Sequence, residues 1–329
     1  MIDGTLSGFV ENATVLVGGD KFVAVGSDLD VPQGTRIVDV SGKWIVPGLI
    51  DSHVHFMTSG RMYTRPAFFD LTHKVSYEQE IGFIKEHLPD TLRANTCAGV
   101  TSVVSMGGPS IEYQARQMAA TMDHAPTVFI GHGVIVPMPK FLAEQMIPPW
   151  DGELTLKPGM SAEDAVVHVQ QGVRKGADLI KTALDSRDSL MIKSMLWYAD
   201  WQDFQKAVVE EAAKNGLPVT THSHELEYAR GAVEAGASSL QHVVADQPVD
   251  EPFVEMLVDE DVVVVPTLAI RKRTFVELFT KELELLEIEG RCSVPGVVAS
   301  WNEPVPSADA QSERYRVQGA MAAANVRAL

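Results

Sequence analysis

The sequence predicts an α/β fold built on a (β/α)8 barrel of the TIM type. From Ile45 onward, short apolar segments alternate with helix-like segments, which is the pattern of βα units and a parallel sheet. Ala-Gly pairs that end helices, such as Ala98-Gly99 and Ala235-Gly236, lie directly before apolar segments. The chain has 329 residues, enough for one large domain and one small one.

Residues 1–44 are expected to form the small domain, and residues 45–329 the barrel. Two strand-like segments, Asn12–Val17 and Lys21–Val25, flank a Gly-Gly-Asp turn and predict a hairpin. The alternation in Arg36–Val40 predicts a further strand.

Seven apolar segments are candidates for barrel strands, with helix-like segments such as Trp201–Asn215 and Glu225–Ala235 between them. The strand candidates are Ile45–Ile50, Val100–Val104, Thr127–Val136, Asp178–Thr182, Leu217–Thr221, Ser238–His242 and Val262–Pro266. Functional sites of such barrels lie at the carboxyl ends of the strands.

The sequence contains no candidate for an eighth strand. Phe275–Gly290 reads as a charged helix, and Gln311–Leu329 reads as an Ala-rich helix. The alternative is a natural barrel of seven strands, which would leave two strand edges unpaired. We therefore expect the chain to be a fragment that lacks the eighth strand.

Composition argues against several classes of partner. Lys and Arg total 27 and Asp and Glu total 44, and the net charge of −17 disfavours nucleic acid and anionic membranes. No apolar run reaches about 18 residues, and no signal peptide is visible, so a cytoplasmic location is expected. Cys97 and Cys292 form no Cys-x-x-Cys pair, so no disulfide framework is indicated and Cys97 is expected to be a core thiol.

Two histidines, His53 and His55, follow the apolar run Ile45–Ile50. Side chains alternate between the faces of a strand, so both imidazoles should point the same way and could bind one metal ion. The alternative for such a pair is one solvent-facing histidine and one packed histidine.

Three further candidates end later strands. Lys181 ends the fourth strand candidate, His222 follows the fifth and His242 ends the sixth. A buried lysine with a depressed pKa becomes a reactive free amine, whereas a surface lysine would pair with Asp178 or Asp185. Because the strand ends of a barrel meet at one mouth, these side chains should converge on the first histidine pair.

Residues 46–56, VPGLIDSHVHF, resemble the first barrel strand of the amidohydrolase superfamily of metal-dependent hydrolases. Within it, the chain is similar to the Xaa-Pro dipeptidase and imidazolonepropionase-like group over nearly its whole length. The resemblance implies that residues 1–44 are part of a small N-terminal β-sandwich whose start is clipped.

The resemblance also implies a set of metal ligands around two divalent ions, expected to be zinc. Lys181 would carry a carbamate that bridges the two ions. The family's general base, an aspartate that ends strand eight in Gly-Thr-Asp, is absent, and Asp309 has helical surroundings. No catalytic residue is therefore assigned, and the fragment itself is expected to be inactive. The implied metal ligands are His53, His55, Lys181, His222 and His242.

Two more histidines are candidates for substrate binding. His224 shares the face of His222 by strand periodicity, so it could contact substrate or be a further ligand, and we assign it to substrate. His132 follows the start of the third strand candidate and could face the mouth, or it could be a packed histidine.

The leading hypothesis is a metal-dependent hydrolase that cleaves an amide C–N bond of a dipeptide or an N-acyl amino acid. A mononuclear aminohydrolase, such as a deaminase or an imidazolonepropionase-like enzyme, is the alternative, with Glu225 as the proton shuttle. Lys181 argues against it, because a single metal needs no bridge. A third hypothesis is a non-catalytic barrel scaffold. The expected partner is a small molecule or dipeptide, and the sequence is compatible with a homo-oligomer.

Overall fold

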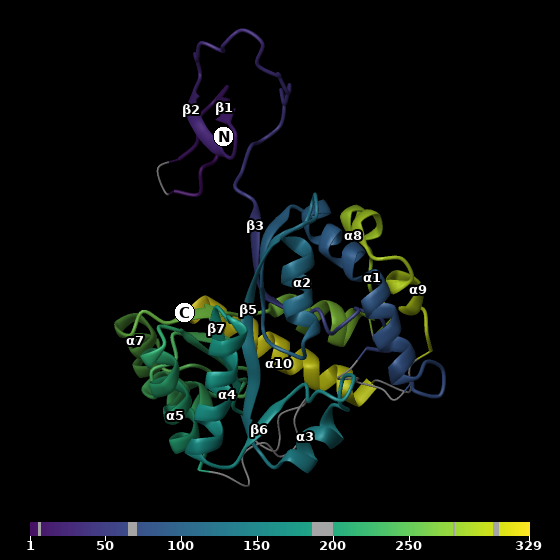
Figure 1. Ribbon diagram of the computed structural model, residues 1–329, viewed down its shortest axis with the longest axis vertical. Coiled ribbons are helices and arrows are strands. Elements are labelled where there is room, and N and C mark those ends of the chain that lie inside the picture. Colours follow the sequence, from purple (N-terminus) through teal and green to yellow (C-terminus); the bar gives the residue numbers. More distant parts are fainter. Residues whose placement is uncertain (6–7, 65–70, 186–199, 279, 305–308) are drawn as a thin grey trace. The chain divides into compact units, whose positions relative to one another are not determined.

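The computed structural model of the chain describes residues 1–5, 8–64, 71–185, 200–278, 280–304 and 309–329 (Figure 1). The chain divides into two units, Met1–Leu49 and Ile50–Leu329, whereas the sequence suggested a boundary before Ile45. None of the described helices is both long enough and apolar enough to cross a bilayer.

The first unit contains the predicted hairpin. Strands β1 (Thr14–Gly18) and β2 (Lys21–Gly26) pair antiparallel. The prediction of a strand at Arg36–Val40 was wrong, because this segment is irregular. Ile37 is 79% exposed and Val38 67%, and the described residues offer the segment no partner strand. A single extended segment cannot satisfy its backbone groups by strand pairing and takes water instead.

The second unit is a nearly closed parallel barrel of seven strands, so the predicted fold class is confirmed. The strands pair in the order β10-β9-β8-β7-β5-β4-β3, and the short strand β6 (Lys157–Gly159) pairs with β5 off this path. The barrel strands are β3 (Leu49–Val54), β4 (Val100–Ser105), β5 (Thr127–Pro137), β7 (Leu179–Ala183), β8 (Val219–His222), β9 (Ser239–Gln241) and β10 (Val263–Val265).

Helices connect the strands and lie outside them, as α4 and α5 do beside β5 and β7 in Figure 1. Serine capping boxes start two of the helices: Ser76 caps α1, and Ser161 caps α4. The helices are α1 (Tyr77–Cys97), α2 (Ile111–Ala119), α3 (Lys140–Met146), α4 (Ala162–Lys175), α5 (Trp201–Lys214), α6 (Leu226–Glu234), α7 (Glu251–Asp259), the π-helix η1 (Ile270–Leu278), α8 (Glu287–Cys292), α9 (Val297–Ser300) and α10 (Asp309–Ala328).

The strand register decides which side chains enter the barrel. Ile180 on β7 pairs with Val219 on β8, and both join the apolar core under α4 and α5. Their neighbours Lys181 and Thr220 also pair with each other. Because successive side chains alternate between faces, Lys181 and Thr220 point away from the helices and into the barrel.

Two predicted elements differ from the structure. The first barrel strand begins at Leu49 rather than Ile45, because Pro47 has no N–H for the sheet and delays pairing. His53 therefore lies inside the strand, and His55 lies one residue beyond it. The predicted single helix at Phe275–Gly290 is instead the end of η1, an irregular segment and the start of α8.

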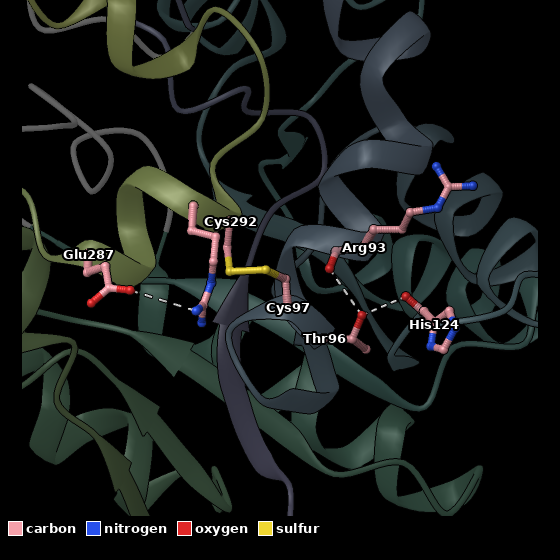
Figure 2. The surroundings of a disulfide bond; sticks show 7 residues. Arg93, Thr96, Cys97, His124, Glu287 and Cys292 are labelled. Carbon is pink, nitrogen blue, oxygen red and sulfur yellow. Dashed lines mark hydrogen bonds and ion pairs between the residues drawn. A yellow bond between two sulfur atoms is a disulfide. The ribbon is translucent and has the colours of Figure 1, made fainter.

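The expectation that Cys97 is a free core thiol was wrong. Cys97, at the end of α1, forms a disulfide with Cys292, at the end of α8, across 195 residues of sequence (Figure 2). Cys97 is exposed, and Thr96 beside it donates to the carbonyl oxygen of His124 at 2.6 Å. Sequence spacing could not reveal a pair that only the fold brings together.

The segment after α8 packs against the loop that follows His55. The backbone N–H of Met62 donates to Oγ of Ser300 at 3.2 Å, and Nε1–H of Trp301 donates to the carbonyl oxygen of Gly60 at 2.9 Å. The disulfide joins the start of this segment to the C-terminal end of α1, beside the N-terminal end of β4, whereas Ser300 and Trp301 lie against the loop after His55.

Replacing Cys97 by serine should lower the free energy of unfolding by roughly 2–5 kcal/mol, because the disulfide closes a long loop in the unfolded chain. Urea unfolding of the wild-type chain and of Cys97→Ser, with and without reductant, measures this. Reductant should destabilise the wild type to the level of Cys97→Ser and leave the variant unchanged. Equal stability of all four samples would contradict the prediction.

Candidate metal centre

Polar side chains from three neighbouring strands line the inside of the barrel near its carboxyl end. Lys181 and Gln241 are each only 2% exposed. They share the inner face with Thr220 and His222 through the register of β7, β8 and β9. Burying so many polar groups is costly unless they bind something or one another, so this end of the barrel is the candidate site.

The two histidines of the first barrel strand are each held through one ring nitrogen. Nδ1–H of His53 donates to Oε1 of Gln241 at 2.7 Å, and Nδ1–H of His55 donates to the carbonyl oxygen of Gly107 at 2.8 Å. Their ring centroids lie 5.3 Å apart. These bonds leave Nε2 of both rings unprotonated, which is the form that binds a metal.

The histidines of β8 and β9 approach the first pair by different routes. His222 is the last residue of β8, and its Nε2–H donates to Oδ2 of Asp185 at 2.7 Å. His242 follows β9 with a φ of 71°, a left-handed conformation that few residues other than glycine adopt. Strand alternation alone would turn His242 away from the side of Gln241. Instead, its ring lies 4.7 Å from that of His53 and 4.5 Å from that of His222.

Lys181 is buried beside these histidines. Among the residues that the structure describes, its Nζ has no hydrogen-bond partner. Burial lowers the pKa of Lys181 well below its ordinary value, although Asp185 opposes this effect. Burial lowers the pKa of all four histidines, and the charged form of Lys181 would add to this effect. The ring distances bring His53, His55, His222 and His242 together, and the strand register places Lys181 on the same inner face as His222. Their role as metal ligands stays a prediction.

Burial keeps the imidazoles neutral. It lowers the pKa of both His55 and His222 to about 4, and in His222 it prevails over the opposing effect of Asp185. Burial also lowers the pKa of His53 and His242 well below the usual value. All four rings are therefore neutral at pH 7 and able to donate a lone pair.

These residues fit a divalent cation. Each of the four histidines has one nitrogen in a hydrogen bond, and within the described part of the chain the other nitrogen has no such partner. His222, His224 and His242 each offer a nitrogen within 4.8 Å of the other two. Imidazole nitrogens suit zinc, and a neighbouring group that holds the second nitrogen is typical of metal-bound histidines.

The two predicted substrate residues lie in different places. His224 belongs to the cluster, since its ring lies 4.6 Å from that of His222 and 4.7 Å from that of His242. The structure does not bring His132 to the cluster. His132 pairs in register with Ile180 and so faces the helices, where its Nδ1 lies 2.9 Å from the hydroxyl of Tyr113.

Sequence reasoning missed three residues that hold the histidines. Gln241 gave a weak sequence signal as a polar residue inside a buried strand. Asp185 was considered only as a partner for Lys181. Glu112, on α2, gave no sequence signal, because a glutamate in an amphipathic helix normally faces solvent.

Glu112 holds the chain directly after His55. Its carboxylate accepts hydrogen bonds from the backbone N–H groups of Phe56 and Met57, both at 2.9 Å, and from the hydroxyl of Ser105 at 2.7 Å. Burial raises the pKa of Glu112 to about 7, although these hydrogen bonds oppose it. The carboxyl group therefore fixes the segment that leaves the first barrel strand.

The barrel and its ring of histidines define a class, the parallel βα barrels with a polar site at the carboxyl ends of the strands. The model of the Amidohydrolase family matches residues 44–266, and the chain belongs to this family.

Individual relatives are distant. Ochratoxinase from Aspergillus niger is 26% identical over 295 residues, which cover 82% of this chain and 57% of the ochratoxinase. Imidazolonepropionase from Deinococcus radiodurans is 22% identical over 253 residues, 72% of this chain and 59% of that protein. The chain thus spans less than two thirds of either relative. The structure of a Xaa-Pro dipeptidase with bound methionine matches with a TM-score of 0.59 at 18% identity, over 92% of this chain and 70% of that one.

The pKa of Glu112 makes stability depend on pH. The folded state keeps a proton on Glu112 that the unfolded state releases between about pH 4.5 and 7. The contribution of protonated Glu112 to the free energy of unfolding is complete below that range and is lost as pH rises through 7. Relative to Glu112→Gln, wild-type stability should fall by roughly 2–3 kcal/mol from pH 4.5 to 8.

Urea unfolding at several pH values measures this difference. Glu163→Gln, at an exposed position of α4, provides the matched control and should show the pH dependence of the wild type. A difference between wild type and Glu112→Gln that stays constant with pH would refute the assignment.

Proposed function

We propose that the protein is a hydrolase that cleaves an amide C–N bond with the help of two divalent metal ions, expected to be zinc. The observation that carries this proposal is the buried amine of Lys181 inside a cluster of neutral histidines. A lysine in such a place is costly unless its charge is removed or converted. The proposed ligands are His53, His55, Lys181, His222 and His242.

The neutral amine of Lys181 can add to carbon dioxide, with loss of one proton, to give a carbamate. The change replaces a cation by an anion with two oxygens, which suits a bridge between two cations. Once bound, the metal ions would lower the pKa of a shared water and polarise the scissile carbonyl. The histidines would hold the ions through the ring nitrogens that are not in hydrogen bonds.

The proposed substrates are dipeptides and N-acyl amino acids. Similarity to a Xaa-Pro dipeptidase supports this class, as does membership of the Amidohydrolase family. A closed mouth would exclude water from the reacting bond, and the segment from Ser300 to Trp301 lies against the loop after His55.

A mononuclear aminohydrolase is the second candidate, because several relatives are imidazolonepropionases. In that case Glu225 would move protons. Glu225 directly precedes α6, and its backbone N–H lies 3.4 Å from Oγ of Ser223. The buried amine of Lys181 favours the binuclear proposal, because a single ion needs no bridge.

Metal counting separates the candidates. After zinc loading and dialysis, the binuclear proposal predicts two ions per chain by elemental analysis, and the mononuclear one predicts a single ion. Absence of bound metal, together with no hydrolysis of a dipeptide and N-acyl amino acid panel by the protein, would support the non-catalytic scaffold and refute both.

Lys181→Met should lower the metal content by about one ion per chain, because it removes the bridging group but keeps a long side chain. With ¹³C-bicarbonate, the wild type should show a carbamate carbon by NMR, and the variant should not. Lys175→Met, whose lysine is 43% exposed, is the control and should match the wild type. An unchanged metal content in Lys181→Met would exclude the bridging role.

A further inference from the structure

Asp185 lies at the centre of a hydrogen-bond network that joins the ends of two barrel strands. It follows β7 and is fully buried, with 0% exposure. Its Oδ2 accepts from Nε2–H of His222 at 2.7 Å and from Nδ1–H of His224 at 3.0 Å. Its Oδ1 accepts from the backbone N–H of His224 at 2.8 Å. One side chain thus contacts two histidines at three points.

The contacts of Asp185 determine where each ring carries its proton. Oδ1 accepts a backbone N–H, and Oδ2 lies within hydrogen-bond distance of one nitrogen of each ring. A carboxylate accepts hydrogen bonds and donates none, so each ring nitrogen that faces it must supply the hydrogen. This requirement determines which nitrogen of each histidine carries the proton.

The two rings are therefore held in different tautomers. His222 is protonated on Nε2 and leaves Nδ1 free, whereas His224 is protonated on Nδ1 and leaves Nε2 free. His222, His224 and His242 each offer one ring nitrogen, and these three nitrogens lie within 4.8 Å of one another. His222 and His224 come from the end of β8, and His242 comes from the end of β9.

We propose that Asp185 is a positioning residue that sets the opposite tautomers of His222 and His224, so that Nδ1 of the first and Nε2 of the second bind the same cation. His224 is then a metal ligand rather than the substrate contact expected from sequence. The inference rests on the proposed function only where it names a cation as the group that these nitrogens bind.

The arrangement differs from the way the first pair is held. His53 and His55 use neutral acceptors, an amide oxygen and a carbonyl oxygen. A carboxylate is a stronger acceptor and makes the histidine more electron-donating. The cation on the side of His222 should therefore be bound more tightly than a cation on the side of His53.

The tautomers can be read directly. Long-range ¹H–¹⁵N spectra of the metal-free wild-type chain distinguish Nδ1–H from Nε2–H rings, and the His222→Gln and His224→Gln chains assign the signals. The expected result is Nε2–H for His222 and Nδ1–H for His224. The same tautomer in both rings would overturn the inference, and this readout needs neither a bound metal nor a variant of Asp185.

Zinc affinity supplies the second test, by competition with a chromophoric chelator. Asp185→Asn keeps one acceptor oxygen, and Asp185→Ala keeps none, so affinity should fall in that order, with a loss of 10–100-fold for alanine. His224→Gln should also weaken zinc at least 10-fold. Asp178→Asn is the matched control, since Asp178 directly precedes β7 but pairs with Arg116 at 3.0 Å, away from the cluster.

The outcomes separate the two proposals. A wild-type chain that binds no zinc would refute the proposed function, while the spectra would still test the tautomers. A wild-type chain that binds zinc no more tightly than folded Asp185→Asn, Asp185→Ala and His224→Gln would overturn the inference and leave the proposed function standing. Circular dichroism of each variant verifies that it is folded.

Discussion

An amine buried among imidazoles is the constraint on which the rest of the site depends. Lys181 enters the barrel between strands whose other faces pack against helices, so it cannot reach solvent. Asp185 attracts its charge, but the oxygens of Asp185 already accept hydrogen bonds from His222 and His224. A full charge on Lys181 would therefore be poorly compensated, and the neutral amine is the favoured form.

The histidines share one principle of construction. Each is held by a group from a different part of the barrel: Gln241 of β9 holds His53 of β3, and the carbonyl of Gly107 after β4 holds His55. The ring of His222 is likewise held from the end of β7. No strand orients its own ligand, so the site exists only when neighbouring strand ends are in place. The geometry of the candidate site and the assembly of the barrel therefore depend on the same contacts.

Much of this could be predicted from sequence, because apolar runs that end in polar residues are a local signal. The strands and the convergence of Lys181, His222 and His53 follow from periodicity and barrel topology. His242 could be placed near them only by analogy, since a left-handed residue breaks the alternation. The roles of Asp185 and Gln241 depend on contacts between distant segments, as does the partner of Cys97. Periodicity holds no information about such contacts.

The link between Cys97 and Cys292 also changes the topology of the chain. It closes a covalent ring that contains β4 to β10, and with them Lys181 and the histidines of β8 and β9. His53 and His55 lie outside this ring, on the segment before it. One group of proposed ligands therefore lies inside the disulfide-closed ring, and the other lies outside it. A single backbone break between residues 97 and 292 would leave both ends of the cut joined through the disulfide. A break between His55 and Cys97 would instead separate the first histidine pair covalently from all the other proposed ligands.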